Sequence, residues 1–443
     1  MLNRQHVKEV LVQASYMSGD RNTIASALRV NPDLGILILT PPGSAESGDE
    51  LKNFYTAVSS SNRVEVLAVP ATQPVPDESL RAAYKAATNL KRKRPDWLSQ
   101  AVAGNVKLQT ATYGTKVISN LFSKKKGGLG AEKARALLQD FWRLEKAHPD
   151  LPDLENRVGE WLTAQRFDPR KRYVFLFTKE GDRYAEKAHH FTSIGTWRLL
   201  VDKLRGYARE SRDDVPVDVI PVAAGDPIGL ETECDLTRFW LRDSWKSLFE
   251  GLSIDGRRAQ LGLWCYLAMQ YGGVSIIGMR SGMIEVPALV GIRTLYLEEE
   301  FNQQAARMAR WIGNVPGFER QVVQRPPGIK QQLSWQETGQ YAEGASLRHL
   351  QNNTEHLKGM TMGSPMKRVQ DPETGKIVLN ERTQRPVLEL RRDTSAPPTQ
   401  QQLMRAIQGK DIAEFGLRTD EWAKIMSWVR NTPPSSYARG QEG

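Results

Sequence analysis

Cysteine is scarce in this 443-residue chain, which contains only Cys234 and Cys265. Their separation fits neither a metal-ligand motif nor a disulfide framework, so we expect both to be reduced core residues. Long hydrophobic runs are missing as well. The first residues lack the apolar core of a signal peptide, and no window approaches the ~20 apolar residues that cross a bilayer. These absences predict a soluble, cytoplasmic protein without a membrane span.

Several catalytic signatures are also missing. The chain has no Gly-x-x-x-x-Gly-Lys-Ser/Thr phosphate loop, no Gly-x-Gly-x-x-Gly after its first predicted strand, no Gly-x-Ser-x-Gly elbow and no His-Glu-x-x-His helix. These absences argue against a kinase, a classical dehydrogenase, a serine hydrolase or a zinc protease. No Asp-x-Asp triad is present to hold a metal–nucleotide complex, and no Cys, His or Asp cluster surrounds His189 and His190. We expect no metal site and no resident cofactor.

The composition is that of a folded globular protein. Hydrophobic residues make up 40% and charged residues 25%, and at ~100–200 residues per domain the length predicts two or three domains. The formal net charge of +10 favours anionic partners, among which phosphate-bearing small molecules, nucleic acid and acidic lipid all fit. Two basic runs, at 91–94 and 124–128, are interpreted as solvated or mobile loops in preference to dedicated binding patches.

Short apolar runs alternate with helical stretches through most of the chain, which predicts parallel strands joined by right-handed crossovers. We therefore expect an α/β fold with two tandem Rossmann-like domains, 1–165 and 166–325. A Gln-, Pro- and Arg-rich extension, 326–443, carries a predicted β-hairpin arm at 367–391 and helical sequence at 398–430. The apolar side chains expected to dock one helical face on the body are Trp422, Ile425, Met426, Trp428 and Val429. The extension also offers a surface for acceptor binding, oligomerisation or partner docking.

The most informative stretch runs from Gly272 to Glu299. A predicted buried strand ends in Arg280-Ser281-Gly282, a short helix follows, and a second strand comes after it. In a parallel sheet such a turn lies at the carboxyl edge, and the helix N-terminus offers an anion site. Gly282 permits close approach, Ser281 and Arg280 can bind a phosphate, and Glu285 can accept hydrogen bonds from ribose hydroxyls.

This pattern, Gly-x-Arg-Ser-Gly-x-x-Glu-x-x-Ala-Leu-x-Gly-x-x-Thr between two strands, resembles the donor-binding element of GT-B-fold glycosyltransferases. Lipopolysaccharide heptosyltransferases, some fucosyltransferases and sugar-nucleotide 2-epimerases carry similar elements, although heptosyltransferases usually have His where Glu285 stands. The resemblance covers roughly residues 173–313, and it reaches 1–120 only as an architectural match. It implies a two-domain enzyme that binds a nucleotide sugar in the second domain.

The resemblance also points to the loop after the strand at 173–179. In GT-B enzymes this loop commonly supplies basic and hydroxyl groups to the donor phosphates, and Lys179, Arg183 and Lys187 stand there in this chain. Taken singly, each of these residues also fits an ordinary solvated loop position.

GT-B enzymes usually take the acceptor and the catalytic base from the first domain. The loop from Tyr16 to Asn22 follows the first predicted strand, so it lies at the carboxyl edge of that sheet. Asp20 is the candidate base for an acceptor hydroxyl, and Arg21 is the candidate holder of an anionic group. Asp20 equally fits a helix N-cap.

Three functions remain open from the sequence. The leading one is a metal-independent glycosyltransferase that moves a sugar by direct displacement from a nucleotide sugar to a protein, glycan or nucleic-acid acceptor. The second is a nucleic-acid-binding protein with a structural α/β core, which the basic runs and the hairpin arm favour. The third is a nucleotide-sugar epimerase or hydrolase, which would share the donor site.

Overall fold

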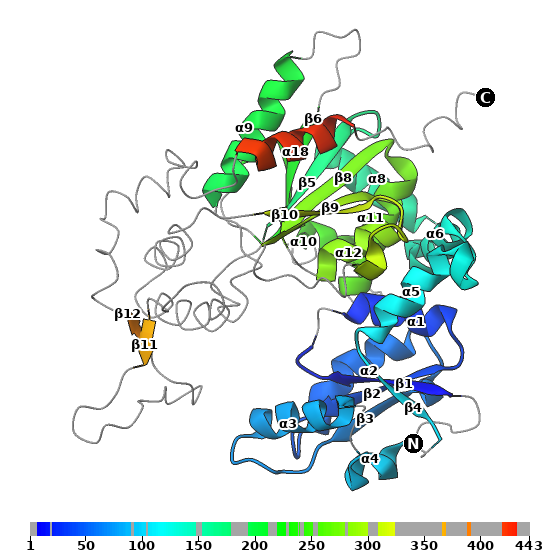
Figure 1. Ribbon diagram of the computed structural model, residues 1–443. Coiled ribbons are helices and arrows are strands. Elements are labelled where there is room, and N and C mark those ends of the chain that lie inside the picture. Colours follow the sequence, from blue (N-terminus) through cyan, green and yellow to red (C-terminus); the bar gives the residue numbers. More distant parts are fainter. Residues whose placement is uncertain are drawn as a thin grey trace. The chain divides into compact units, whose positions relative to one another are not determined.

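A computed structural model shows an α/β protein whose chain divides into two compact units (Figure 1). Unit 1 comprises Met1–Arg143 with Ala288–Gly291 and Ala305–Phe318, and unit 2 comprises Leu144–Pro287, Ile292–Gln304 and Glu319–Gly443. The division after Arg143 falls earlier than the expected domain boundary at 165. The structure describes residues 7–17, 20–89, 93–102, 105–147, 153–178, 194–210, 219–226, 230–237, 239, 243–250, 256–279, 282–299, 309–323, 366–368, 388–390 and 419–431.

The sheet of unit 1 has four strands in the order β3-β2-β1-β4, with every neighbouring pair parallel. Each of the seven residues of β2 is buried. Such continuous apolar burial is typical of a parallel strand covered by helices on both faces. The strands are β1 (Glu9–Ala14), β2 (Leu34–Thr40), β3 (Val64–Ala68) and β4 (Lys107–Thr110).

The helices of unit 1 follow the strands in the predicted alternation. They are α1 (Arg21–Val30), η1 (Ala45–Gly48), α2 (Asp49–Thr56), η2 (Ser61–Arg63), α3 (Pro76–Thr88), α4 (Asp96–Ala101), α5 (Tyr113–Phe122), η3 (Lys124–Lys126) and α6 (Ala131–Trp142). Proline opens α3, where its missing N–H costs no helical hydrogen bond. The sequence at 106–119 predicts a further strand, of which the structure forms only Lys107–Thr110, because α5 begins at Tyr113.

The sheet of unit 2 has six strands in the order β10-β9-β8-β5-β6-β7. Numbered from β5 along the chain, this order is 3-2-1-4-5-6, which is that of the Rossmann fold. The pairs β5–β6, β6–β7, β5–β8 and β8–β9 are parallel. The strands are β5 (Arg172–Thr178), β6 (Val219–Gly225), β7 (Cys234–Thr237), β8 (Gly273–Met279), β9 (Arg293–Glu299) and β10 (Phe318–Val323).

Helices cover both faces of this sheet. Val174 and Leu176 of β5 pack with α9 on one face, and Phe175 packs against Trp264 of α11 on the other, with the two ring centroids 5.1 Å apart. The alternation follows the period of two along a strand. The helices are α7 (Leu144–Ala147), α8 (Leu154–Ala164), α9 (Ile194–Glu210), α10 (Asp243–Lys246), η6 (Ser247–Phe249), α11 (Gly256–Gln270) and α12 (Gly282–Leu289).

A helix from the far end of the chain completes unit 2. This helix, α18 (Thr419–Arg430), lies with α9 on one face of the sheet (Figure 1). Its backbone carbonyls accept hydrogen bonds from Arg172 of β5 (3.2 Å to Val429), Arg293 of β9 (3.0 Å to Trp428) and Gln321 of β10 (3.0 Å to Glu421). The predicted docking is confirmed, since the core of unit 2 includes Trp422, Ile425, Trp428 and Val429, with Met426 packed against it.

The polar extension is described only in part. Strands β11 (Met366–Arg368) and β12 (Leu388–Leu390) pair antiparallel within the predicted arm, with Arg368 opposite Leu388. The sequence Asp-Pro-Glu-Thr-Gly at 371–375 predicts the turn of this arm and lies outside the described residues, but the register of the two strands is centred near residue 378 and not on that turn. No helix in the described ranges is long and apolar enough to cross a membrane.

Candidate functional site

In unit 2, strands β5 and β8 form the point where the strand order reverses. From β5 the chain builds the sheet towards β6 and β7, whereas β8 leads to β9 and β10 on the other side. The register pairs Phe177 with Gly278, so the carboxyl ends of the two strands lie side by side. Ligands of such sheets bind in the crevice outside these ends.

Both segments expected to bind the nucleotide sugar leave the sheet at this point. Lys179, Arg183 and Lys187 follow the end of β5, and Arg280 and Ser281 follow the end of β8. These five residues lie outside the described part of the chain, so the structure fixes only the strand ends from which they start. The carboxyl ends of β5 and β8 are neighbours in the sheet.

Helix α12 begins at Gly282, three residues after the end of β8 at Met279. A Cβ atom on Gly278 would lie 2.3 Å from Cδ1 of Ile284 and 2.9 Å from Cβ of Phe177, so glycine at this position lets α12 pack close to the sheet. Glu285 stands in the first turn of α12 and is 1% exposed. The positive end of the helix macrodipole stabilises a carboxylate there.

The neighbouring strand end is held rigidly. Gly225 closes β6 with φ +91°, and a Cβ atom there would lie 2.3 Å from the carbonyl oxygen of Thr178. The Thr178 hydroxyl donates to the carbonyl of Ala224 at 2.6 Å, and the backbone N–H of Asp226 donates to the Thr178 carbonyl at 3.0 Å. The carboxyl ends of β5 and β6 therefore form a fixed rim beside the reversal point.

A buried ion pair at the end of β9 was not predicted from the sequence. Glu298 is fully buried, and its Oε2 lies 2.8 Å from Nη2 of Arg320 on β10. Removing one partner of such a pair leaves an uncompensated buried charge, which costs about 3–5 kcal/mol. The sequence does place Glu298 directly after the apolar residues of a predicted strand, and this position could have indicated a buried charge with a partner.

In unit 1, Asp20 and Arg21 lie at the carboxyl edge of the sheet, as expected. Asp20 is 8% exposed and occupies the N-cap position of α1, but its side chain makes no capping hydrogen bond there. Arg21 is buried, with its Nη1 2.7 Å from Oε1 of Glu50 and its guanidinium over the ring of Phe54. Arg21 therefore connects α1 to α2, and this contact was not predictable from the sequence.

Two tyrosines accompany Asp20 at this edge. Burial raises the pKa of Tyr84 to about 12, and Tyr16 and the Asp20 carboxylate add to the rise. Tyr16 is half exposed. Gln13 holds the backbone after β1 in place, because its side chain donates to the carbonyl of Met17 and accepts from the Tyr55 hydroxyl at 2.7 Å. The edge thus places a carboxylate among hydroxyl groups, which suits proton transfer from an acceptor hydroxyl.

Among the described residues, no group of three or more His, Cys, Asp and Glu side chains is arranged to hold a metal ion. Compared with models of known protein families the chain matches none, and comparison with curated proteins gives no match either. The proposal below therefore depends on the geometry at the carboxyl edges of the two sheets.

Proposed function

We propose that the protein is a metal-independent glycosyltransferase of the GT-B type, in which unit 2 binds a nucleotide sugar and unit 1 binds the acceptor. One observation carries this proposal. Unit 2 has the Rossmann strand order, and α12 starts at Gly282 beside its reversal point, directly after Arg280 and Ser281 in the sequence. The nucleotide sugar is a co-substrate, and no resident cofactor takes part.

In the proposed reaction an acceptor hydroxyl attacks the anomeric carbon of the donor sugar. Asp20 takes the hydroxyl proton, the bond between sugar and phosphate breaks, and the nucleoside diphosphate leaves with the electron pair. Arg280, Ser281 and the N-terminus of α12 stabilise the charge that develops on the diphosphate, which is usually the dominant catalytic effect. Lys179, Arg183 and Lys187 add positive charge from the loop after β5.

Glu285 is the proposed partner of the ribose hydroxyls. Because it is 1% exposed, this contact requires that nucleotide binding uncovers the carboxylate. Glu285→Gln keeps the shape of the side chain and removes its charge, so the variant should fold normally and bind nucleotide more weakly. A wild-type affinity in this variant would remove Glu285 from the site and leave the phosphate contacts untouched.

Thermal unfolding with a panel of nucleoside diphosphates and nucleotide sugars tests donor binding. A ligand at 100 times its Kd stabilises its folded target by about 2.7 kcal/mol, which is measurable for a protein of this size. We expect selective stabilisation by one base. Absence of stabilisation by every nucleotide would contradict the proposal.

Arg280→Ala tests the assigned phosphate contact. We expect turnover to fall by orders of magnitude while the unfolding temperature stays unchanged. Arg170→Ala is the matched control, because Arg170 is an exposed arginine of unit 2 whose side chain pairs with Asp168. Equal activity of the two variants would remove Arg280 from the site. If the wild-type protein releases free sugar from the nucleotide sugar when no acceptor is present, the reaction is hydrolysis and not transfer.

A further inference from the structure

The basic run Lys124–Lys126 belongs to an ordered turn, whereas the sequence analysis interpreted it as a solvated or mobile loop. Backbone N–H groups of Gly127, Gly128 and Gly130 donate to the carbonyls of Lys124 (3.0 Å), Ser123 (3.0 Å) and Leu121 (3.3 Å). We call Ser123–Gly130 the lysine turn.

Glycine is required at these positions for two different reasons. Gly127 and Gly130 have φ of +77° and +86°, a region that other residues rarely adopt. At Gly128 a Cβ atom would lie 2.0 Å from the carbonyl oxygen of Asn120. The three glycines therefore fix the turn against the end of α5, and the lysines stand on a rigid support.

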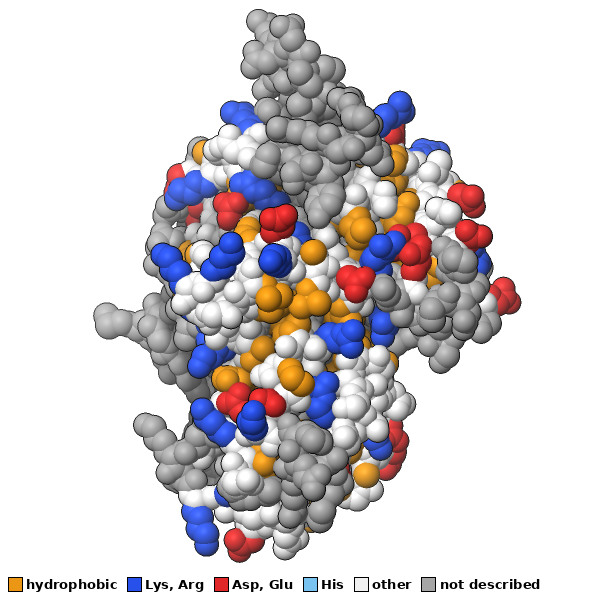
Figure 2. All heavy atoms as spheres, turned by 90° about the vertical axis from the view of Figure 1, so that its right-hand side faces the viewer, with side chains coloured by type: hydrophobic (Ala, Val, Ile, Leu, Met, Phe, Trp, Pro, Cys, Tyr) orange, Lys and Arg blue, Asp and Glu red, His pale blue; other side chains and the backbone are white. Residues whose placement is uncertain are grey.

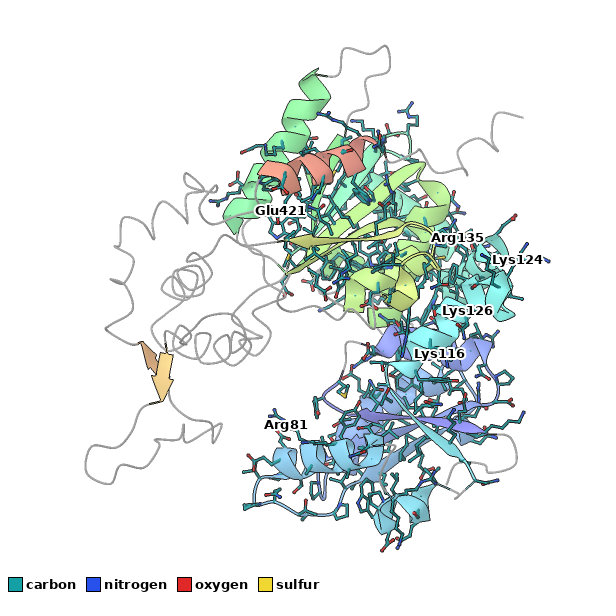
Figure 3. The ribbon with its side chains drawn as sticks, in the orientation of Figure 1. Arg81, Lys116, Lys124, Lys126, Arg135 and Glu421 are labelled. Atoms are coloured by element: carbon teal, nitrogen blue, oxygen red, sulfur yellow. The ribbon has the colours of Figure 1, made fainter. Side chains whose placement is uncertain are left out.

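The lysine turn projects into solvent. Lys124, Lys125, Lys126 and Gly127 are all exposed, and a Cβ atom on Gly127 would meet nothing within 4 Å. The labelled side chains of Lys116, Lys124 and Lys126 follow one another along α5 and the turn after it (Figure 3).

Aliphatic side chains are exposed beside these lysines. Leu129, within the turn, is 43% exposed. The Nζ of Lys126 lies 3.3 Å from Oδ1 of Asn314, which brings the segment of Ile312 against the turn, and Ile312 is 41% exposed. On the face shown in Figure 2, hydrophobic side chains gather, and Lys, Arg, Asp and Glu side chains surround them. We call Lys124, Lys125, Lys126, Leu129 and Ile312 the lysine–aliphatic patch.

The lysine turn and the helix before it carry only positive charge. Residues 113–131 contain four lysines and no aspartate or glutamate. Cationic side chains with exposed aliphatic neighbours match an anionic bilayer surface, where lysine heads meet lipid phosphates and the aliphatic groups enter the headgroup boundary. Single-stranded nucleic acid fits less well, because residues 123–130 offer no aromatic ring for base stacking.

We propose that the lysine–aliphatic patch binds the surface of an anionic phospholipid membrane. The binding is peripheral and reversible, and it brings unit 1 to the bilayer without a spanning segment. It needs neither the nucleotide site of unit 2 nor Asp20, so it stands independently of the proposed glycosyl transfer.

Co-sedimentation of the full chain with vesicles tests this proposal. We expect binding to vesicles of phosphatidylcholine and phosphatidylglycerol, weakening as salt rises, and no binding to phosphatidylcholine alone. The variant with Lys124→Gln, Lys125→Gln and Lys126→Gln should bind roughly 100-fold more weakly, since one lysine near an anionic surface contributes about fivefold. The control changes the exposed lysines Lys52, Lys85 and Lys93 to Gln, which removes the same charge elsewhere on unit 1.

Ile312→Ser separates the aliphatic contribution from charge. This variant keeps every lysine, and we expect its binding to fall about tenfold at the same salt concentration. Full binding by the triple lysine variant, or equal losses in the lysine control, would overturn the proposal. Retention of duplex DNA that is lost in the triple lysine variant, with no vesicle binding by the wild type, would assign the patch to nucleic acid and also overturn it.

Discussion

The two units begin with the same strand order and complete their sheets by different means. Counted from its first strand, each unit starts as 3-2-1-4, and unit 2 then adds β9 and β10. Unit 1 is covered largely by helices that alternate with its strands, whereas unit 2 also needs α18, from near the end of the chain. Local alternation therefore sets the strand order, while the cover of a face can come from a distant segment.

Truncation after Arg418 should break unit 2 and leave unit 1 folded. Full burial of a large apolar side chain contributes about 1.5–3 kcal/mol, so losing Trp422, Ile425, Trp428 and Val429 removes about 6–12 kcal/mol. That is comparable to the whole stability of a domain. Hydrogen exchange should show loss of protection in β5 and β9 with β1 and β2 unaffected. A chain truncated after Asn431, which retains α18, is the control, and unchanged protection of β5 would refute this role of α18.

Asp20→Asn should separate chemistry in unit 1 from binding in unit 2. Loss of a general base lowers turnover by about 10²–10⁴-fold, and nucleotide affinity should not change. Asp33→Asn is the control, because Asp33 is an exposed carboxylate of unit 1 that pairs with Lys8. Steady-state kinetics and nucleotide titration measure the two effects. Wild-type turnover in Asp20→Asn would exclude Asp20 as the base without affecting the donor site.

A glycine in each unit permits close packing to a different degree. Gly278→Ala should destabilise unit 2 by about 1–3 kcal/mol, because the added Cβ forces Ile284 and Phe177 to shift. In unit 1 the matching change, Gly114→Ala, meets Ile24 at 3.5 Å, an ordinary contact, and lies in α5. It should be neutral or stabilise by up to about 1 kcal/mol. Denaturant unfolding compares them, and equal effects would show that α12 is not packed tightly on β8.

The smallest expected effect is on a tyrosine pKa. The pKa of Tyr84 is raised to about 12 by burial, by Tyr16 and by Asp20, so Asp20→Asn should lower it. The pKa of Tyr173 in unit 2, also raised to about 12 chiefly by burial, should stay unchanged. NMR titration of labelled tyrosine resolves both groups. An unshifted Tyr84 would place the Asp20 carboxylate too far away to interact.

These tyrosines also predict how stability depends on pH. A folded-state pKa above the unfolded value near 10 means that folding favours the neutral phenol. The stabilisation is therefore fully present below pH 10, and it is lost as the pH rises from about 10 to about 12. Denaturant midpoints measured across this window should fall in both units.

Elements with a strong local pattern were predictable. The apolar runs of β1, β2, β5 and β8 matched their strands closely, and the spacing of tryptophans in α18 predicted its buried face. Strands β7 and β10 and helix α10 were not predicted. β7 and α10 have four residues each, too few to show a period, and β10 alternates weakly. Their structure depends on neighbours supplied by the rest of unit 2.

The candidate site was predictable where it depends on chain order. The positions of Gly282 and Glu285 at the start of a helix follow from the strand that precedes them. The pairing of Arg21 with Glu50 was not predictable, because it depends on how α2 folds back on α1. The solvent exposure of the lysine turn was predicted, but its fixed backbone was not, because the pattern Lys-Lys-Lys-Gly-Gly-Leu-Gly does not show the positive φ of Gly127 and Gly130.

The hydrogen bond between Gln321 of β10 and Glu421 of α18 has a further consequence for chain connectivity. Because β10 ends at Val323 and α18 begins at Thr419, the chain between them starts and finishes at neighbouring points of unit 2. Closing a longer loop costs only about 0.6 kcal/mol per doubling of length, so an insertion anchored in this way is tolerated over a wide range of sizes. A designed short bridge between Val323 and Thr419 should therefore keep β10 and α18 in place, and with them the sheet that holds the proposed nucleotide site.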